Sequence, residues 1–286
     1  VPYTAEEREI HQTLNDYCAS REKDAERFGG TFGTSFVNQL LKKRLFSSPA
    51  AFASTLEKHI ATLSNTIKPK VQDALAERIL RKAILKVDED YADDQEVENA
   101  QSEAVEEASR RSQPLTQEQQ GMLADLRQWA QRAKNQTDSK ARAILDLLSA
   151  HLKPGGQWND RRVILFTEYR TTHQWMHEIL ASHGFGGERL GLLHGGLTQD
   201  EREPIKAAFQ ASPKDSPVRI LLATDAASEG IDLQNHCNCL IHLEIPYNPN
   251  VMEQRNGRID RHGQREKEVL IWHPVDGGSD GLASVG

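Results

Sequence analysis

The residue types that could do chemistry are concentrated near the end of the chain, at positions 254–264, which read QRNGRIDRHGQ. Arg258 and Arg261 are three residues apart, so a short helix would present both on one face. Planar guanidinium groups in that arrangement suit a polyphosphate whose negative charge grows while a bond breaks. Arg258, Arg261 and the nearby Gln254 are therefore candidate catalytic residues.

A structural ion pair is the alternative role for these arginines, with Glu253 or Asp260 as the partner. A phosphate-binding loop of the form GxxxxGK[ST] would hold such a polyphosphate through its backbone amides and its lysine. The chain contains no Gly-Lys dipeptide. The glycine-rich residues 29–35 also have no preceding strand, so we interpret them as a loop. Residues 84–89 imitate a magnesium-binding Asp-Glu box, but the helical periodicity around them indicates a coincidence.

The second half of the chain alternates expected strands with expected helices. Residues 163–166 form a continuous apolar run, which is typical of a buried parallel strand. Four further strands are expected, at 189–193, 218–223, 239–243 and 269–272. This order predicts a RecA-like three-layer α/β domain with a mostly parallel sheet, in which ligands bind beyond the carboxyl ends of the strands.

Polar clusters follow these strands directly. They are Thr167-Glu168, His194-Gly195-Gly196 and Thr224-Asp225, and the arginine pair follows the fourth strand. Because parallel strands end at one edge of their sheet, we expect the four clusters to lie together. In residues 224–234, Thr224 could donate to a phosphate oxygen, Gly230 allows close approach to a ligand, and Asp232 could accept from a ribose hydroxyl. An ordinary strand-to-helix turn is the alternative.

The first half of the chain has the periodicity of helices. Helix caps are expected at Thr4, Ser48, Thr116 and Ser139. The break at residues 153–156 divides a helical region or insertion, 1–153, from an α/β region, 154–286. Residues 88–107 hold ten acidic residues and no basic one. They are expected to be an exposed or mobile connection between helices, with an acidic docking surface as the alternative.

Composition limits the class of protein. The chain has 286 residues, a net charge of −7 and a pI near 5.9, which argues against a uniformly basic nucleic-acid binder but not against a local basic groove. Three cysteines favour a reducing, cytoplasmic compartment, and no apolar run predicts a membrane span. Cys237 and Cys239 with nearby histidines invite a zinc site, but packing is favoured and no metal is expected. Both ends of the sequence suggest a fragment of a longer protein.

Four ordered motifs, at 163–169, 193–196, 224–234 and 254–264, together resemble the second RecA-like lobe of superfamily-two helicases. More narrowly, they resemble Swi/Snf-type translocases, whose last motif QxxxRxxRxGQ is matched in full by residues 254–264. The stretch LEIPYNP before that motif is similar to the bacterial branch that includes the RNA-polymerase-associated ATPases. The specific match covers about 160–273. The helical half of the chain matches only loosely.

This resemblance implies a role for each matching residue. Arg258 and Arg261 would be arginine fingers for ATP held with Mg²⁺ by an N-terminal lobe outside this chain, and Gln254 would line the same cleft. Gly230 and Asp232 would lie near the nucleotide. The remaining residues would face the nucleic-acid backbone, double-stranded DNA first of all: Thr167, Arg170, His194, Gly195 and Thr224.

The resemblance predicts an ATP-driven DNA translocase that grips phosphates rather than reads bases. Without the first lobe, the chain alone is expected to hydrolyse no ATP. Two alternatives stay open at this point. The chain could be a protein-interaction module that docks a partner such as RNA polymerase, or it could be part of a strand-separating helicase.

Overall fold

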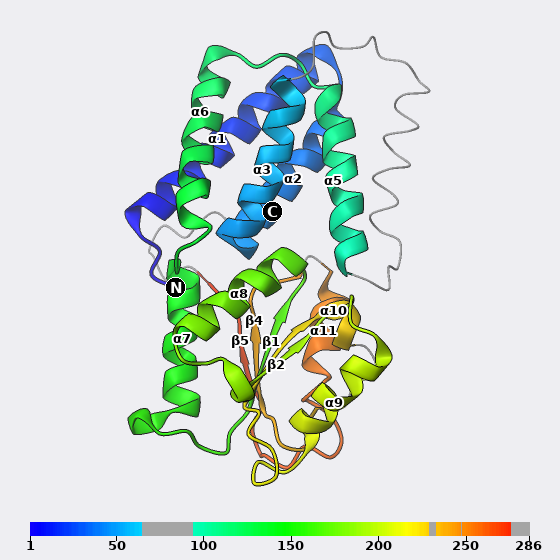
Figure 1. The fold of residues 1–286 in the computed structure, drawn as a ribbon. Helices are drawn as coiled ribbons and strands as arrows, with labels where there is room; N and C mark the ends of the chain where they lie inside the picture. The colour runs from blue at the N-terminus through cyan, green and yellow to red at the C-terminus, as the bar shows by residue number, and fades with distance from the viewer. Residues whose placement is uncertain (65–93, 229–232, 247, 276–286) are drawn as a thin grey trace. The chain divides into compact units, whose positions relative to one another are not determined.

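The computed structural model describes residues 1–64, 94–228, 233–246 and 248–275, which fall into two compact units (Figure 1). The α/β unit comprises residues 137–275 with residues 1–2 and 94–95, and the helical unit comprises residues 3–64 and 96–136. In the part of the chain that is described, no helix is long and apolar enough to cross a membrane.

A five-stranded parallel sheet forms the centre of the α/β unit, in the order β2-β3-β1-β4-β5. The strands are β1 (Val163–Thr167), β2 (Leu190–Leu193), β3 (Ile220–Thr224), β4 (Cys239–His242) and β5 (Leu270–Trp272). All five predicted strands are confirmed, although β3 begins two residues later than expected. β1 and β3 are buried along their whole length, which explains why their sequences are continuous apolar runs rather than alternating ones.

Helices lie against both faces of this sheet, as the predicted three-layer architecture requires. They are α7 (Ser139–Leu152), α8 (Arg170–Ser182), α9 (Gln199–Gln210), α10 (Asp225–Ser228) and α11 (Pro249–Asn256), with single turns η1 (Pro154–Gly156) and η2 (Gly187–Arg189). Ile164 and Phe166 of β1 share one apolar cluster with Phe209 of α9 and Ala227 of α10. Alternate residues of β1 point to the opposite face, where α8 contacts β1 and β3.

The division between the two units lies at residue 137 rather than at the expected 154. Helix α7 belongs to the α/β unit because its apolar stripe, including Ile144 and Leu148, is buried and the helix contacts α8. The cap of α7 also differs from expectation. Asp138, not Ser139, accepts the backbone N–H of Ala141, at 2.7 Å.

The helical unit consists of α1 (Ala5–Phe28), α2 (Thr31–Ser47), α3 (Pro49–Ser64), most of α5 (Asp94–Arg110) and α6 (Gln117–Ala133). Caps predicted at Thr4, Ser48 and Thr116 are confirmed by their hydrogen bonds. The loop expected at 29–35 is wrong for residues 31–35, which begin α2. Only Gly29 and Gly30 form the connection, and both take φ of 93°, a conformation that favours glycine.

The acidic stretch is helical from residue 94 onward, so the expectation of a mobile connection is wrong for that part. One side of α5 is buried, and the Oε1 atom of Glu98 accepts a 2.7 Å hydrogen bond from Nη1 of Arg44. Gln101 accepts from Nη2 of the same guanidinium, also at 2.7 Å. A buried cation with two acceptors on successive turns explains why acidic and amide residues recur on one face of α5. Residues 84–89 lie outside the described residues.

Candidate functional site

The carboxyl ends of the central strands meet at one edge of the sheet, as predicted. Thr167 at the end of β1 is the register partner of Thr224 at the end of β3, and Leu193 at the end of β2 pairs with Ala223. The polar clusters that follow these strands therefore start side by side. Three side chains that sequence reasoning did not select connect them.

Glu244, just beyond β4, organises the turn after β1. Its carboxylate accepts the hydroxyl of Thr167 at 3.0 Å and the backbone N–H of Glu168. Burial raises the pKa of Glu244, and the positive charges of Arg255 and Lys140 oppose that rise. The hydroxyl of Thr167 is fully buried by this contact. Thr167 therefore supports the turn from inside, in contrast to the expected position facing a nucleic-acid backbone.

His173, in the first turn of α8, connects two further candidates. Its Nδ1 lies 2.8 Å from Nη1 of Arg170, and its ring packs edge-on against His194 with centroids 5.5 Å apart. Its Nε2 lies 3.1 Å from the carbonyl oxygen of Leu222 in β3. Burial, followed by the charge of Arg170, lowers the pKa of His173 to about 3. The ring is therefore neutral at physiological pH.

Asp94 connects the last two candidates. This residue clusters with the α/β unit, and its side chain is buried there. Its Oδ2 accepts the backbone N–H of Gly195 at 2.6 Å and the hydroxyl of Thr224 at 2.5 Å. Arg202 of α9 donates to the carbonyl oxygen of Gly195 and so fixes the same loop from the other side. Gly195 and Thr224 thus present two donors that converge on one anionic oxygen.

Asp225 joins this edge to the helix that precedes the arginine pair. Both of its carboxylate oxygens accept from Arg255 of α11, from Nε and Nη2, each at 2.6 Å. The Arg255 side chain is almost fully buried and lies over the ring of Phe166, 5.6 Å from its centroid. Nη1 of Arg255 also donates to the carbonyl oxygen of Glu244, at 3.3 Å.

The arginine pair does not lie on a regular helix, as the three-residue spacing had suggested. Helix α11 ends at Asn256, and Arg258 and Arg261 follow in a series of turns. Gly263 takes φ of +93°, which ends this segment in a conformation that other residues rarely adopt. Arg261 and Gln254 are exposed, whereas Arg258 is half-buried.

Arg258 makes no side-chain ion pair or hydrogen bond with the described residues, and its Nε atom is buried. The ion pair with Glu253 or Asp260, the alternative role for this arginine, is therefore not seen among them. An arginine that pairs with no acidic side chain among the described residues is suited to an anion supplied by another molecule. The polyphosphate-binding role of Arg258 stays a prediction.

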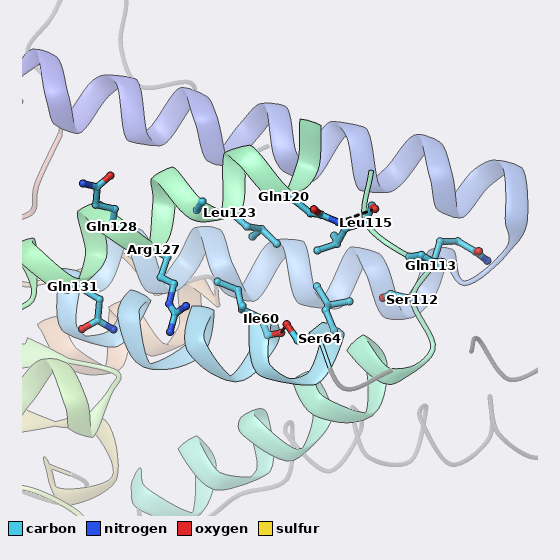
Figure 2. A pocket seen from close by; sticks show the side chains of 13 residues that line it. Ile60, Ser64, Ser112, Gln113, Leu115, Gln120, Leu123, Arg127, Gln128 and Gln131 are labelled. Atoms are coloured by element: carbon cyan, nitrogen blue, oxygen red, sulfur yellow. Dashed lines mark hydrogen bonds between the residues drawn. The ribbon is translucent and has the colours of Figure 1, made fainter. Parts of the chain in front are cut away.

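The other candidate sites contribute less. Gly230 and Asp232 lie outside the described residues. Cys237 and Cys239 are buried free thiols, and no group of three potential metal ligands occurs among residues that the structure describes. An open groove of about 790 Å³ lies in the helical unit between α3 and α6, and Figure 2 shows its lining around Ile60 and Leu123. It contains none of the candidate residues.

Comparisons with known proteins agree with this geometry. Residues 139–263 match the helicase conserved C-terminal domain. The uncharacterized ATP-dependent helicase YqhH of Bacillus subtilis (strain 168) is 35% identical over 136 residues, which are 48% of this chain and 21% of that protein. The RNA polymerase-associated protein RapA of Yersinia enterocolitica is 39% identical over 84 residues, 29% of this chain and 8% of that protein. The chain thus spans about a fifth or less of these relatives' lengths.

Among solved structures, the C-terminal part of the Fun30 ATPase domain is similar, with a TM-score of 0.51 and 17% sequence identity. The similarity covers 96% of this chain and 82% of that one, and it shows likeness of fold. The matched domain, its position in the sequence and the resemblance to RapA agree with the motif at residues 254–264. Residues 139–263 are therefore identified as a helicase C-terminal domain, a RecA-like lobe similar to those of the Swi/Snf-like superfamily-two helicases.

Proposed function

We propose that this lobe serves an ATP-dependent DNA translocase in two ways. It grips the nucleic-acid backbone through the edge of its sheet, and it supplies Arg258 and Arg261 to ATP held with Mg²⁺ by an N-terminal lobe. The observation that supports this proposal most directly is the convergence of Gly195 N–H and the Thr224 hydroxyl on one carboxylate oxygen. Two such donors at the ends of neighbouring strands can equally bind a phosphodiester oxygen.

The proposed backbone contacts are Arg170, His194, Gly195 and Thr224. Contacts of this kind position a protein on DNA but carry no base sequence, so the expected binding is sequence-independent and weakened by salt. Hydrolysis of ATP between the two lobes would then move this grip along the strand. Because the similar RapA proteins are RNA polymerase-associated, RNA polymerase is the first protein partner to test.

Thr224→Val in the full-length protein tests the grip. Valine has the shape of threonine without the hydroxyl, so the β3 backbone should be preserved while one donor to the phosphate is lost. A hydrogen bond to a charged group contributes ~1.5–3 kcal/mol, so we expect the Kd for double-stranded DNA to rise ~10-fold or more. Fluorescence anisotropy on an oligonucleotide at fixed salt measures this.

Thr62→Val in α3 is the matched control, because its hydroxyl donates to Lys58 within the same helix of the helical unit. The proposal predicts unchanged DNA affinity for this control. Equal Kd values for Thr224→Val and the unmodified protein would remove Thr224 from the interface.

A further inference from the structure

His173 lies outside the four sequence motifs, but its contacts connect it to the proposed nucleic-acid interface. It is almost fully buried, yet it contacts two of the proposed backbone-binding residues, Arg170 and His194. Its protonation pattern follows from its partners. The carbonyl oxygen of Leu222 can only accept, so Nε2 carries the proton and donates to it. The neutral ring then has a lone pair at Nδ1, which accepts from the guanidinium of Arg170.

We propose that His173 is a positioning residue, which holds the Arg170 guanidinium at the nucleic-acid edge through its unprotonated Nδ1. The anchor to Leu222 makes this more than a local contact. Leu222 lies two residues before Thr224 in β3, so the imidazole links the first turn of α8 to the strand that carries another proposed phosphate donor. A long arginine side chain that is oriented before binding loses less rotamer entropy when it meets a phosphate. This inference rests on the proposed function of Arg170.

Two conservative substitutions of His173 distinguish the contribution of Nδ1 from that of Nε2. His173→Asn places an amide oxygen near the position of Nδ1, and His173→Gln reaches the position of Nε2 with its amide nitrogen. If His173 acts through Arg170, the asparagine variant should bind double-stranded DNA much as the unmodified full-length protein does. The glutamine variant should show a Kd raised by about five- to tenfold, because the contact between position 173 and the Arg170 guanidinium is lost.

A double-mutant cycle and a thermal melt complete the test. In an Arg170→Ala background the glutamine substitution should change Kd no further, because the residue that it positions is gone. A purely structural role predicts instead that Kd follows Tm, and that the glutamine effect persists in that background. Either result overturns the inference. If Arg170→Ala itself leaves Kd unchanged, the proposed contact of Arg170 fails and this inference fails with it.

A separate observation concerns Asp94. The two donors proposed for a phosphate, Gly195 N–H and the Thr224 hydroxyl, both bind its Oδ2 atom. A phosphodiester oxygen cannot use the same donors while the carboxylate occupies them. From this we infer that Asp94 competes with the nucleic-acid backbone for this position and weakens DNA binding until it is displaced. This inference also rests on the proposed function.

Asp94→Asn in the full-length protein tests the competition, because asparagine keeps the shape of the side chain and removes its charge. Expected is a Kd for double-stranded DNA lowered by about fivefold or more, since the neutral amide is a weaker acceptor for both donors. Glu96→Gln is the matched control. It removes the same charge two residues away on α5, where the side chain is exposed.

Equal tightening by Asp94→Asn and Glu96→Gln would mean that only general charge repulsion is relieved, and would overturn the inference. Weaker binding by Asp94→Asn would overturn it as well, because Asp94 would then support the shape of the site. Unchanged binding by Asp94→Asn would also overturn the inference if Thr224→Val still weakens binding. If neither Asp94→Asn nor Thr224→Val changes the Kd, the proposed grip on the DNA backbone is itself wrong.

Discussion

Replacing Arg261 with alanine in the full-length protein is expected to lower DNA-stimulated ATP turnover by ~10³-fold or more, the range measured for arginine fingers in other nucleotide hydrolases. A finger stabilises charge that develops only in the transition state, so kcat should fall while KM for ATP changes little. Steady-state hydrolysis with saturating DNA measures both constants. Arg258→Ala should behave in the same way, because the Arg258 side chain pairs with none of the described residues.

Two controls decide whether this effect belongs to the fingers. Arg265→Ala removes an equally exposed arginine four residues beyond Arg261 and should leave turnover unchanged. Arg261→Lys keeps the positive charge but loses the planar fork, so it should recover only a small part of the activity. Undiminished turnover in Arg261→Ala would remove this residue from the catalytic machinery. The 286-residue chain alone should hydrolyse no ATP under the same conditions if, as proposed, another lobe holds the nucleotide.

The arrangement of the sheet could be read from the sequence because the relevant signals are local. Each buried parallel strand is a short apolar run, and its carboxyl end is marked by polar residues such as Thr167 and Thr224. Parallel pairing then brings those ends to one edge without further information. The helix caps at Thr4 and Thr116 could also be predicted from the sequence, because a capping box involves residues only three apart.

The residues that organise the site could not be read in this way. Asp94 meets Thr224 across 130 positions, Glu244 meets Thr167 across 77, and His173 meets Leu222 across 49. Nothing in the local pattern of an isolated Asp, Glu or His distinguishes a buried organiser from a surface residue. The acidic content of residues 88–107 even suggested the opposite for Asp94, because a run of like charges is usually solvated.

The same limitation explains the misplaced helical features. The three-residue spacing of Arg258 and Arg261 predicts a shared helix face only if the helix continues, and α11 ends before them. In α2, a Gly-Thr-rich beginning concealed the first turn of a helix whose stability comes from buried residues such as Leu41 and Arg44. Tertiary packing overrides weak local preferences in both segments.

Among the substitutions considered, Asp225→Ala is expected to lower the stability of the fold most, because it leaves the buried guanidinium of Arg255 without its carboxylate partner. Removing one partner of a buried ion pair costs ~3–5 kcal/mol, and the partial exposure of Asp225 favours the lower end of that range. Urea unfolding of the chain should show a lower midpoint with little change in slope. Asp215→Ala, at an exposed position, should leave the midpoint unchanged.

The double variant Asp225→Ala/Arg255→Met distinguishes a stranded charge from lost packing. Methionine fills much of the arginine volume beside Phe166 without a charge, so the double variant should be more stable than Asp225→Ala alone. If it is less stable, the packing of the arginine stem matters more than its pairing.

The ion pair between Asp225 and Arg255 also connects the two parts of the proposed site. Asp225 directly follows Thr224, and Arg255 lies in α11, the helix that precedes Arg258. A folded Asp225→Asn protein should therefore bind DNA and ATP, but DNA should stimulate its ATP hydrolysis less. Comparison of ATP turnover with and without DNA measures this.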